Sequence, residues 1–189
     1  MQVDAFRAKR AQVLNVKFSR DFMDTFAWHY TTGNLFIEIC DRGAVLPAKT
    51  SYGPIVWFST ESLWEPTALQ RDPNLNLQAN TTGRLLGQMA EICRQGGGLV
   101  RLGVSLSSGK VLPWLDVLEA AGFPYLTRRL LETADEQSGG RAKRHHFGMS
   151  GEVFSLADIE RTETFDWNLK GWALPESVIE RMPPLIAPV

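Results

Sequence analysis

The chain has 189 residues, of which 44% are hydrophobic and 22% are charged, and its formal net charge is −1. This length and composition are typical of a single water-soluble globular domain. The small net charge excludes a whole-molecule field that would attract nucleic acid or an anionic membrane, so any such contact needs a local patch.

The sequence predicts a cytoplasmic setting without membrane contact. No apolar run reaches the roughly 18 residues of a membrane-spanning helix, and residues 1–20 lack the apolar centre of a secretory signal. We interpret Cys40 and Cys93 as small buried hydrophobic residues in preference to a disulfide or a redox pair. The cysteines and the pair His145-His146 lack metal-ligand spacing, so no metal site is predicted.

Hydrophobic periodicity and turn residues predict strands and helices that mix without strict alternation. This order favours an α+β fold over a doubly wound parallel sheet. The three glycines 96–98 follow a helix, which predicts a C-terminal cap and not a phosphate cradle. The predicted elements are, in chain order, helices within 4–26, a strand at 27–31, a helix at 34–42, an extended piece at 44–46, a turn at 49–54, a strand at 55–59, a helix at 83–95, a strand at 99–104, helices at 113–121 and 125–132, a loop at 136–144, and strands at 151–155 and 160–166.

The same patterns suggest one domain with two extensions. Residues 1–26 are interpreted as an N-terminal helical extension, 27–174 as the domain, and 175–189, with four prolines, as a C-terminal tail along the surface. A polar segment at 61–82 is too long for an ordinary connection. It is either a functional loop, such as a lid over a ligand, or partly disordered.

His29, in the segment WHYTTGN (28–34), is the most informative residue. An imidazole beside a tyrosine and two threonines, where a strand opens into a helix, is a common way to build a nucleotide pocket, because the ring nitrogens and hydroxyls can face one ligand. The same seven residues also contain the capping chemistry of any helix start, so they need support from a second site.

Glu152, in SGEVFS (150–155), begins a predicted strand directly after the basic run 141–146. A carboxylate there could hydrogen-bond a ribose hydroxyl and stabilise positive charge developing at the anomeric carbon. The alternative is a solvated strand residue. The basic run could contact the phosphates of a nucleotide or a nucleic acid, or could be a solvated loop.

A third candidate site is VWFST (56–60), which supplies aromatic surface and two hydroxyls at a strand end. By strand alternation, Trp57 and Ser59 share one face of the sheet and Phe58 takes the other. An aromatic ring there could stack on a heterocycle while Ser59 holds its polar edge. Because strand aromatics are usually buried, one of these faces is expected to be core.

Together, the His-Tyr-Thr strand that leads into a helix, the strand ending in Trp-Phe-Ser-Thr and the late Glu-Val-Phe strand followed by Ile159 resemble the ADP-ribosyltransferase superfamily. The likeness spans roughly residues 27–166. It is greatest to bacterial members that carry histidine in the first strand in place of arginine, such as the DNA-modifying DarT-type toxins, and to the RNA 2′-phosphotransferases.

The resemblance implies an α+β fold in which a split pair of small β-sheets with flanking helices grips NAD, as substrate, in the cleft between the sheets. Glu152 matches the catalytic glutamate, and His29 matches the first-strand histidine that bonds the adenosine ribose or nearby backbone. The segment 139–151 matches the part that recognises the acceptor. The implied cofactor-binding residues are His29, Tyr30, Thr31, Trp57 and Ser59.

The implied activity is cleavage of the nicotinamide–ribose bond and transfer of ADP-ribose to a nucleic-acid or protein acceptor, with an antitoxin or immunity protein as a partner. Glu152 would stabilise the charge on the ribose, and could orient or deprotonate the acceptor. Two alternatives stay open. An RNA 2′-phosphotransferase-like enzyme would be favoured by arginines converging near His29, and a non-catalytic binding or immunity module by a filled cleft.

Overall fold

The computed structural model describes residues 25–50, 53–65, 68, 85–137, 139–151 and 153–175. The strands are β1 (Phe26–Thr32), β2 (Ala44–Val45), β3 (Ala48–Thr50), β4 (Gly53–Ser59), β5 (Leu99–Ser105), β6 (Leu112–Pro113), β7 (His146–Ser150), β8 (Phe154–Ser155), β9 (Arg161–Asp166) and β10 (Gly171–Ala173). The helices are α2 (Gly33–Arg42), α3 (Leu85–Gly96), α4 (Trp114–Ala120), α5 (Tyr125–Gln137) and α6 (Arg141–His145), and single 3-10 turns lie at Leu106–Ser108 and Leu156–Asp158.

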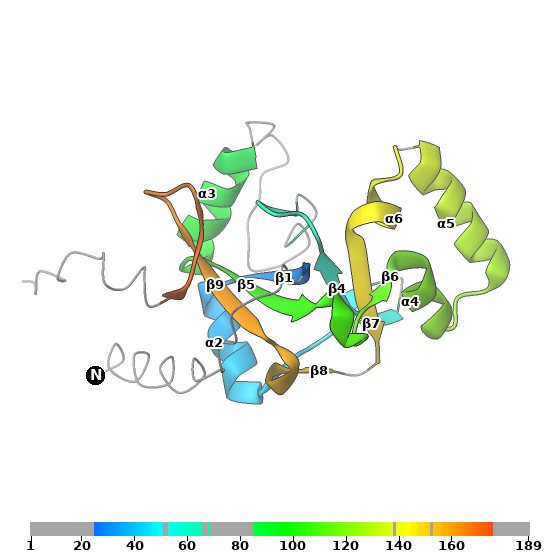
Figure 1. The fold of residues 1–189 in the computed structure, drawn as a ribbon, viewed down its shortest axis with the longest axis horizontal. Coiled ribbons are helices and arrows are strands. Elements are labelled where there is room, and N and C mark those ends of the chain that lie inside the picture. The colour runs from blue at the N-terminus through cyan, green and yellow to red at the C-terminus, as the bar shows by residue number, and fades with distance from the viewer. Residues whose placement is uncertain are drawn as a thin grey trace, which may run out of the picture.

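Within these ranges the strands form an eight-stranded sheet with the order β10-β9-β5-β1-β4-β7-β6, in which β3 also pairs with β4 (Figure 1). A second sheet consists of β2 and β8 alone. All of the described pairings are antiparallel. This confirms the predicted α+β class, because a doubly wound fold needs parallel strands joined by crossover helices.

The central strand β1 separates two faces of the main sheet. Ala27 packs in one apolar cluster and Trp28 in another, as expected from strand alternation. The face that carries Ala27 also carries His29 and Phe58 of β4, and we call it the His29 face. We call the opposite face the Trp28 face. Every side chain at the middle of the sheet therefore belongs to one of two separate environments.

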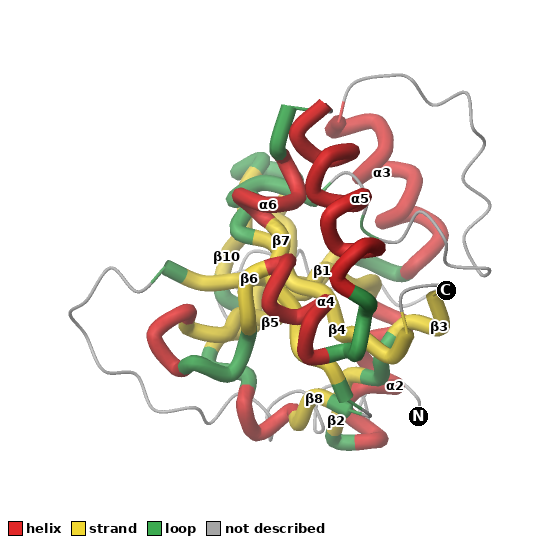
Figure 2. Tube along the Cα trace, turned by 90° about the vertical axis from the view of Figure 1, so that its right-hand side faces the viewer, coloured by secondary structure: helices red, strands yellow, loops and turns green. Residues whose placement is uncertain are grey.

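Each face is covered by different elements. On the His29 face, α2 contributes Phe36 and Ile39, and β8 contributes Phe154, to one cluster with Phe58. On the Trp28 face, α3 covers the part of the sheet around Trp28. On the same face, α4 packs on Ile55 through Trp114, Val117 and Leu118. Figure 2 shows α2 and the β2–β8 sheet on one side of the main sheet and α3 on the other.

Most of the locally predicted elements are confirmed. The predicted strands at 27–31, 55–59 and 99–104 correspond to β1, β4 and β5, and the helix at 34–42 corresponds to α2. Thr32 caps that helix by accepting a hydrogen bond from Leu35 N (3.3 Å), and Gly43 closes it in the left-handed conformation. Residues adjacent to the helix therefore specify where it begins and ends.

The structure differs from the predicted secondary structure in the region 136–150. Residues 141–145 form α6 where a loop was expected, and 146–150 form β7, which pairs with β4 along its length. The reason is tertiary: the Asp135 carboxylate accepts hydrogen bonds from Ala142 N (2.8 Å) and Lys143 N (3.3 Å) at the start of α6. A cap supplied from the preceding helix leaves no local sequence signal.

Some predicted elements lie outside the described residues. These are the N-terminal extension up to residue 24, most of the segment 61–82, and the tail after Pro175. The strand β10, which the sequence did not predict, pairs with β9 just before that tail. In the described ranges, every helix is too short or too polar to cross a bilayer.

Glycine permits a close approach between the start of α2 and the end of α3. Gly33 N donates to Gly98 O (3.0 Å), and a Cβ on Gly33 would lie 2.3 Å from Gly97 O. Gly97 and Gly98 have φ values of +70° and +116°, as the predicted C-terminal cap requires. The glycine triplet therefore joins the two helices.

We expect Gly33→Ala to lower the free energy of unfolding by about 1–3 kcal/mol, because the new methyl group would overlap main-chain atoms. Gly87→Ala is the matched control: it lies inside α3, where a Cβ would meet nothing within 4 Å. That change is expected to be neutral or to stabilise by up to about 1 kcal/mol. Urea unfolding of the two variants checks this, and equal midpoints would contradict it.

Candidate functional site

His29 lies at the middle of β1, between β4 and β5. Its Nδ1–H donates to Trp57 O (2.9 Å), which fixes the ring orientation and leaves Nε2 as an acceptor. Burial lowers the pKa of His29 below the ordinary 6.5, and the bond to Trp57 opposes this only in part. A neutral imidazole with one oriented acceptor nitrogen is suited to receive a hydroxyl or N–H of a ligand.

The His29 face also carries Phe154, two residues after Glu152. The His29 ring lies 5.8 Å from the Phe58 ring, which lies 5.1 Å from the Phe154 ring. On the other side, Gly151 N donates to Pro54 O (3.1 Å) in β4. Glu152 itself lies outside the described residues, but the residues that bracket it contact the same strand that His29 contacts.

The other predicted site residues divide between the two faces. Thr31 is 1% exposed and shares the His29 side of β1. Trp28 pairs with Ser59, so Ser59 and Trp57 belong to the Trp28 face, together with Tyr30. The predicted sharing of a face by Trp57 and Ser59 is thus confirmed, but the structure does not bring their side chains together with that of His29.

The Trp28 face binds the start of the polar segment through its main chain. Three successive carbonyl groups of residues 61–63 accept hydrogen bonds from side chains of the sheet. Tyr30 donates to Glu61 O, Arg101 to Ser62 O (2.5 Å) and Trp172 to Leu63 O (2.6 Å). Burial raises the pKa of Tyr30 to about 12, so its hydroxyl stays a donor at neutral pH.

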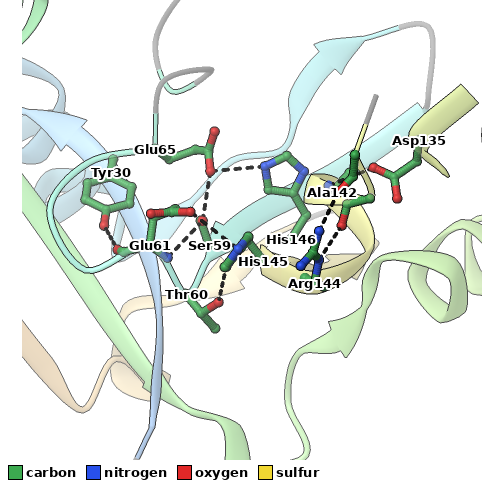
Figure 3. A network of polar contacts seen from close by, with 12 residues as sticks. Tyr30, Ser59, Thr60, Glu61, Glu65, Asp135, Ala142, Arg144, His145 and His146 are labelled. Carbon is green, nitrogen blue, oxygen red and sulfur yellow. Dashed lines mark hydrogen bonds and ion pairs between the residues drawn. The ribbon is translucent and has the colours of Figure 1, made fainter. Parts of the chain in front are cut away.

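A polar network follows directly along this segment (Figure 3). Ser59 Oγ donates to Glu65 Oε2 (2.9 Å), and His146 Nε2 lies 3.2 Å from the same oxygen. Beside them, Thr60 Oγ1 lies 3.3 Å from His145 Nδ1. The network joins the end of β4 to α6 and β7, and the buried carboxylate of Glu65 is at its centre.

Glu65 was not among the predicted site residues, although one signal was available. The segment 61–65 reads ESLWE, in which Leu63 and Trp64 interrupt a polar stretch. Trp64 is 1% exposed and Glu65 is 5% exposed. A bulky aromatic residue inside a polar segment indicates a buried anchor, and an acid next to it is then held near the core.

The basic run 141–146 has internal partners, which supports a structural role for it. Lys143 Nζ lies 2.9 Å from Glu132 Oε1, and Arg144 donates to Gly140 O (3.0 Å) and Gly139 O. The two histidines contact the loop after β4, as described above. In this helix the described side chains are therefore occupied by the protein itself, with less capacity for phosphate than the sequence suggested.

The cysteines and metal chemistry add nothing to the site. Cys40 and Cys93 are only partly buried and form no disulfide, and Cys93 Sγ accepts a hydrogen bond from Trp167 Nε1 (3.3 Å). Each packs against an apolar cluster, as expected, but neither is fully buried. Across the described part of the chain, no group of His, Cys, Asp and Glu side chains is arranged to hold a metal ion.

We expect His29→Asn to flatten the pH dependence of stability between about pH 5 and pH 8. Because the pKa of His29 is lowered on folding, the unfolded chain binds more protons between the lowered value and 6.5. Unfolding free energy therefore rises with pH in this window, and the contribution of His29 is lost as pH falls below 6.5. Asparagine can keep a donor for Trp57 O but does not titrate. Urea midpoints across pH check this, and parallel profiles for the two proteins would contradict it.

No family model, no curated protein and no solved structure matches this chain significantly.

Proposed function

We propose that the chain is an NAD-dependent ADP-ribosyltransferase whose β2–β8 sheet and main sheet correspond to the split sheets of that fold. Glu152 acts as the catalytic carboxylate and His29 as the residue that orients NAD. The acceptor is a nucleic acid or a protein. This proposal rests on the sequence motifs, and one structural observation carries it further.

That observation is the convergence of two distant motifs on the His29 face. Gly151, immediately before Glu152, donates to Pro54 O, and Phe154, two residues after Glu152, contacts Phe58, whose ring also faces His29. A neutral Nε2 acceptor on this face can bind one part of a dinucleotide, and we assign the reacting ribose to Glu152. The second sheet packs on this face through Phe154, which belongs to the same apolar cluster as Phe58.

The proposed reaction breaks the bond between C1′ of the ribose and the nicotinamide nitrogen. Nicotinamide leaves with the electron pair of that bond, and positive charge develops on the ribose. The ionised Glu152 stabilises this charge. An oxygen or nitrogen of the acceptor then forms the new bond to C1′ and gives its proton to Glu152 or to solvent. Water as acceptor would give free ADP-ribose.

The remaining predicted site residues support the cleft in different ways. The Trp57 carbonyl fixes the tautomer of His29, which decides that Nε2 is the acceptor. Thr31 and Thr32 define the turn from β1 into α2. Tyr30 and Ser59 hold the loop after β4 from the opposite face, so we assign them positioning roles.

The structure does not favour phosphotransfer over ADP-ribosyl transfer. Arg101 pairs with Glu163 on the Trp28 face, and Arg161 pairs with the same carboxylate. Arg42 pairs with Glu38 on an exposed part of α2. These arginines therefore do not converge on His29, as a site for a phosphate dianion would require.

Titration with NAD tests the proposal directly. Calorimetry should give saturable binding, and chromatography of the mixture should show release of nicotinamide. Labelled NAD with separate protein, DNA and RNA acceptors then identifies the class of product. Binding without nicotinamide release under any of these conditions would indicate a non-catalytic module, and absence of binding would reject the nucleotide site.

A further inference from the structure

A cleft of about 300 Å³ opens on the Trp28 face, on the opposite side of the sheet from His29. A volume of this size is at the lower end for small-molecule sites. It lies between β1, the loop after β4, and the strands β5 and β9. Its polar lining combines two guanidinium groups, one carboxylate and three hydroxyls, from Arg101, Arg161, Glu163, Thr25, Thr60 and Ser62.

The charges in this cleft do not balance. Glu163 is 2% exposed, and both of its oxygens are occupied: Oε2 accepts from Arg101 Nε (2.7 Å), and Oε1 lies 2.6 Å from Arg161 Nη2. One carboxylate thus offsets two guanidinium groups. The next carboxylates along the loop, Glu61 and Glu65, face His145 and His146. The wall of the cleft therefore carries an excess of one positive charge.

The two arginines differ in how they are held. Arg101 is almost buried, and its guanidinium carbon lies 3.8 Å from the Trp28 ring centroid and 4.7 Å from that of Trp172. Arg161 has 46% of its side chain exposed and lies over the Phe26 ring (5.8 Å). Among the described residues, the Arg161 guanidinium has no other ion-pair partner than Glu163. It can therefore offer further N–H groups to a ligand at the mouth of the cleft.

We propose that this cleft binds a small oxyanion, the phosphate or the carboxylate of a low-molecular-weight ligand. Arg161 contacts the anion through its planar fork, which matches either group. Arg101 supplies a fixed charge behind it, and the hydroxyls of Thr25 and Ser62 are within the same lining. Because the sheet separates this cleft from His29, the site is a second one, and it does not rest on the proposed NAD chemistry.

Calorimetric titration of the full chain with inorganic phosphate, AMP and succinate, at constant ionic strength, tests the site. We expect saturable one-to-one binding of at least one probe, weakened at least about tenfold in Arg161→Gln. The matched control is Arg94→Gln, an arginine on α3 with 71% exposure whose partner is Glu91, and it should bind as the wild type does.

Comparison of the three probes distinguishes a phosphate ligand from a carboxylate ligand. Preference for phosphate and AMP assigns a phosphate-bearing ligand, and preference for succinate assigns a carboxylate. A second readout is the indole N–H resonance of Trp28, which should shift on binding. Failure of all three probes to saturate at millimolar concentration, or equal binding by Arg161→Gln and wild type, would overturn the proposal.

Discussion

Glu152→Gln is expected to slow nicotinamide release from NAD by roughly 100- to 10,000-fold while leaving the urea midpoint unchanged. The proposed reaction develops positive charge on the ribose, and glutamine has the size of glutamate without its charge. The loss should fall on the rate constant more than on the affinity for NAD, because the carboxylate acts mainly in the transition state. Single-turnover measurement of nicotinamide, beside calorimetric binding, separates the two.

The matched control for this change is Glu136→Gln. Glu136 is a carboxylate on α5 with 61% exposure, so its replacement should leave turnover at the wild-type level. Wild-type turnover by Glu152→Gln would remove this residue from the mechanism. If that variant keeps its activity while His29→Asn loses it, the carboxylate of the reaction must be sought elsewhere on the His29 face.

Glu163→Ala is expected to lower the free energy of unfolding by about 3–5 kcal/mol. Arg101 is 9% exposed, and burial lowers the pKa of its guanidinium while Glu163 opposes that shift. Without the carboxylate, a buried positive charge would remain between two tryptophan rings, beside the Ser62 carbonyl and the Tyr30 hydroxyl. Urea unfolding monitored by tryptophan fluorescence measures this loss.

An exposed ion pair provides the comparison. Lys110 Nζ lies 2.6 Å from Asp158 Oδ1, with both side chains more than a third exposed, so Asp158→Asn should cost less than about 1 kcal/mol. Replacing the buried pair with Arg101→Met and Glu163→Leu together should recover much of the loss, because no buried charge is left unpaired and Arg161 is 46% exposed. A cost for Glu163→Ala no larger than that of Asp158→Asn would show that Arg101 does not depend on its partner.

The elements that the sequence predicted correctly have local causes. The β-branched and aromatic run of β4, the Thr32 cap of α2 and the left-handed Gly43 after it are each specified by neighbouring residues. Strand alternation likewise placed Trp57 and Ser59 on one face. By contrast, α6 depends on a carboxylate from the previous helix, and β10 is only three residues long and pairs across a short turn.

The side-chain arrangement of the site could not be predicted for a different reason. Alternation decides which residues of one strand share a face, but the register between strands decides which faces coincide. The pairing of Trp28 with Ser59 puts Ser59 opposite the side that His29 occupies. Shifting that register by one residue would have gathered His29 and Ser59 on one face. Registers of this kind follow from the packing of the whole core, which a single sequence does not display.

The main chain of residues 61–63 is held by hydrogen bonds from Tyr30, Arg101 and Trp172, and this affects how the sequence can diverge. These side chains recognise main-chain oxygens, which every amino acid provides. Homologous chains can therefore carry other residues at 61 and 62 and keep the same conformation. An insertion or deletion of one residue there would move the carbonyl groups away from their hydrogen-bond donors. In this stretch, we expect the number of residues to vary less than their identity.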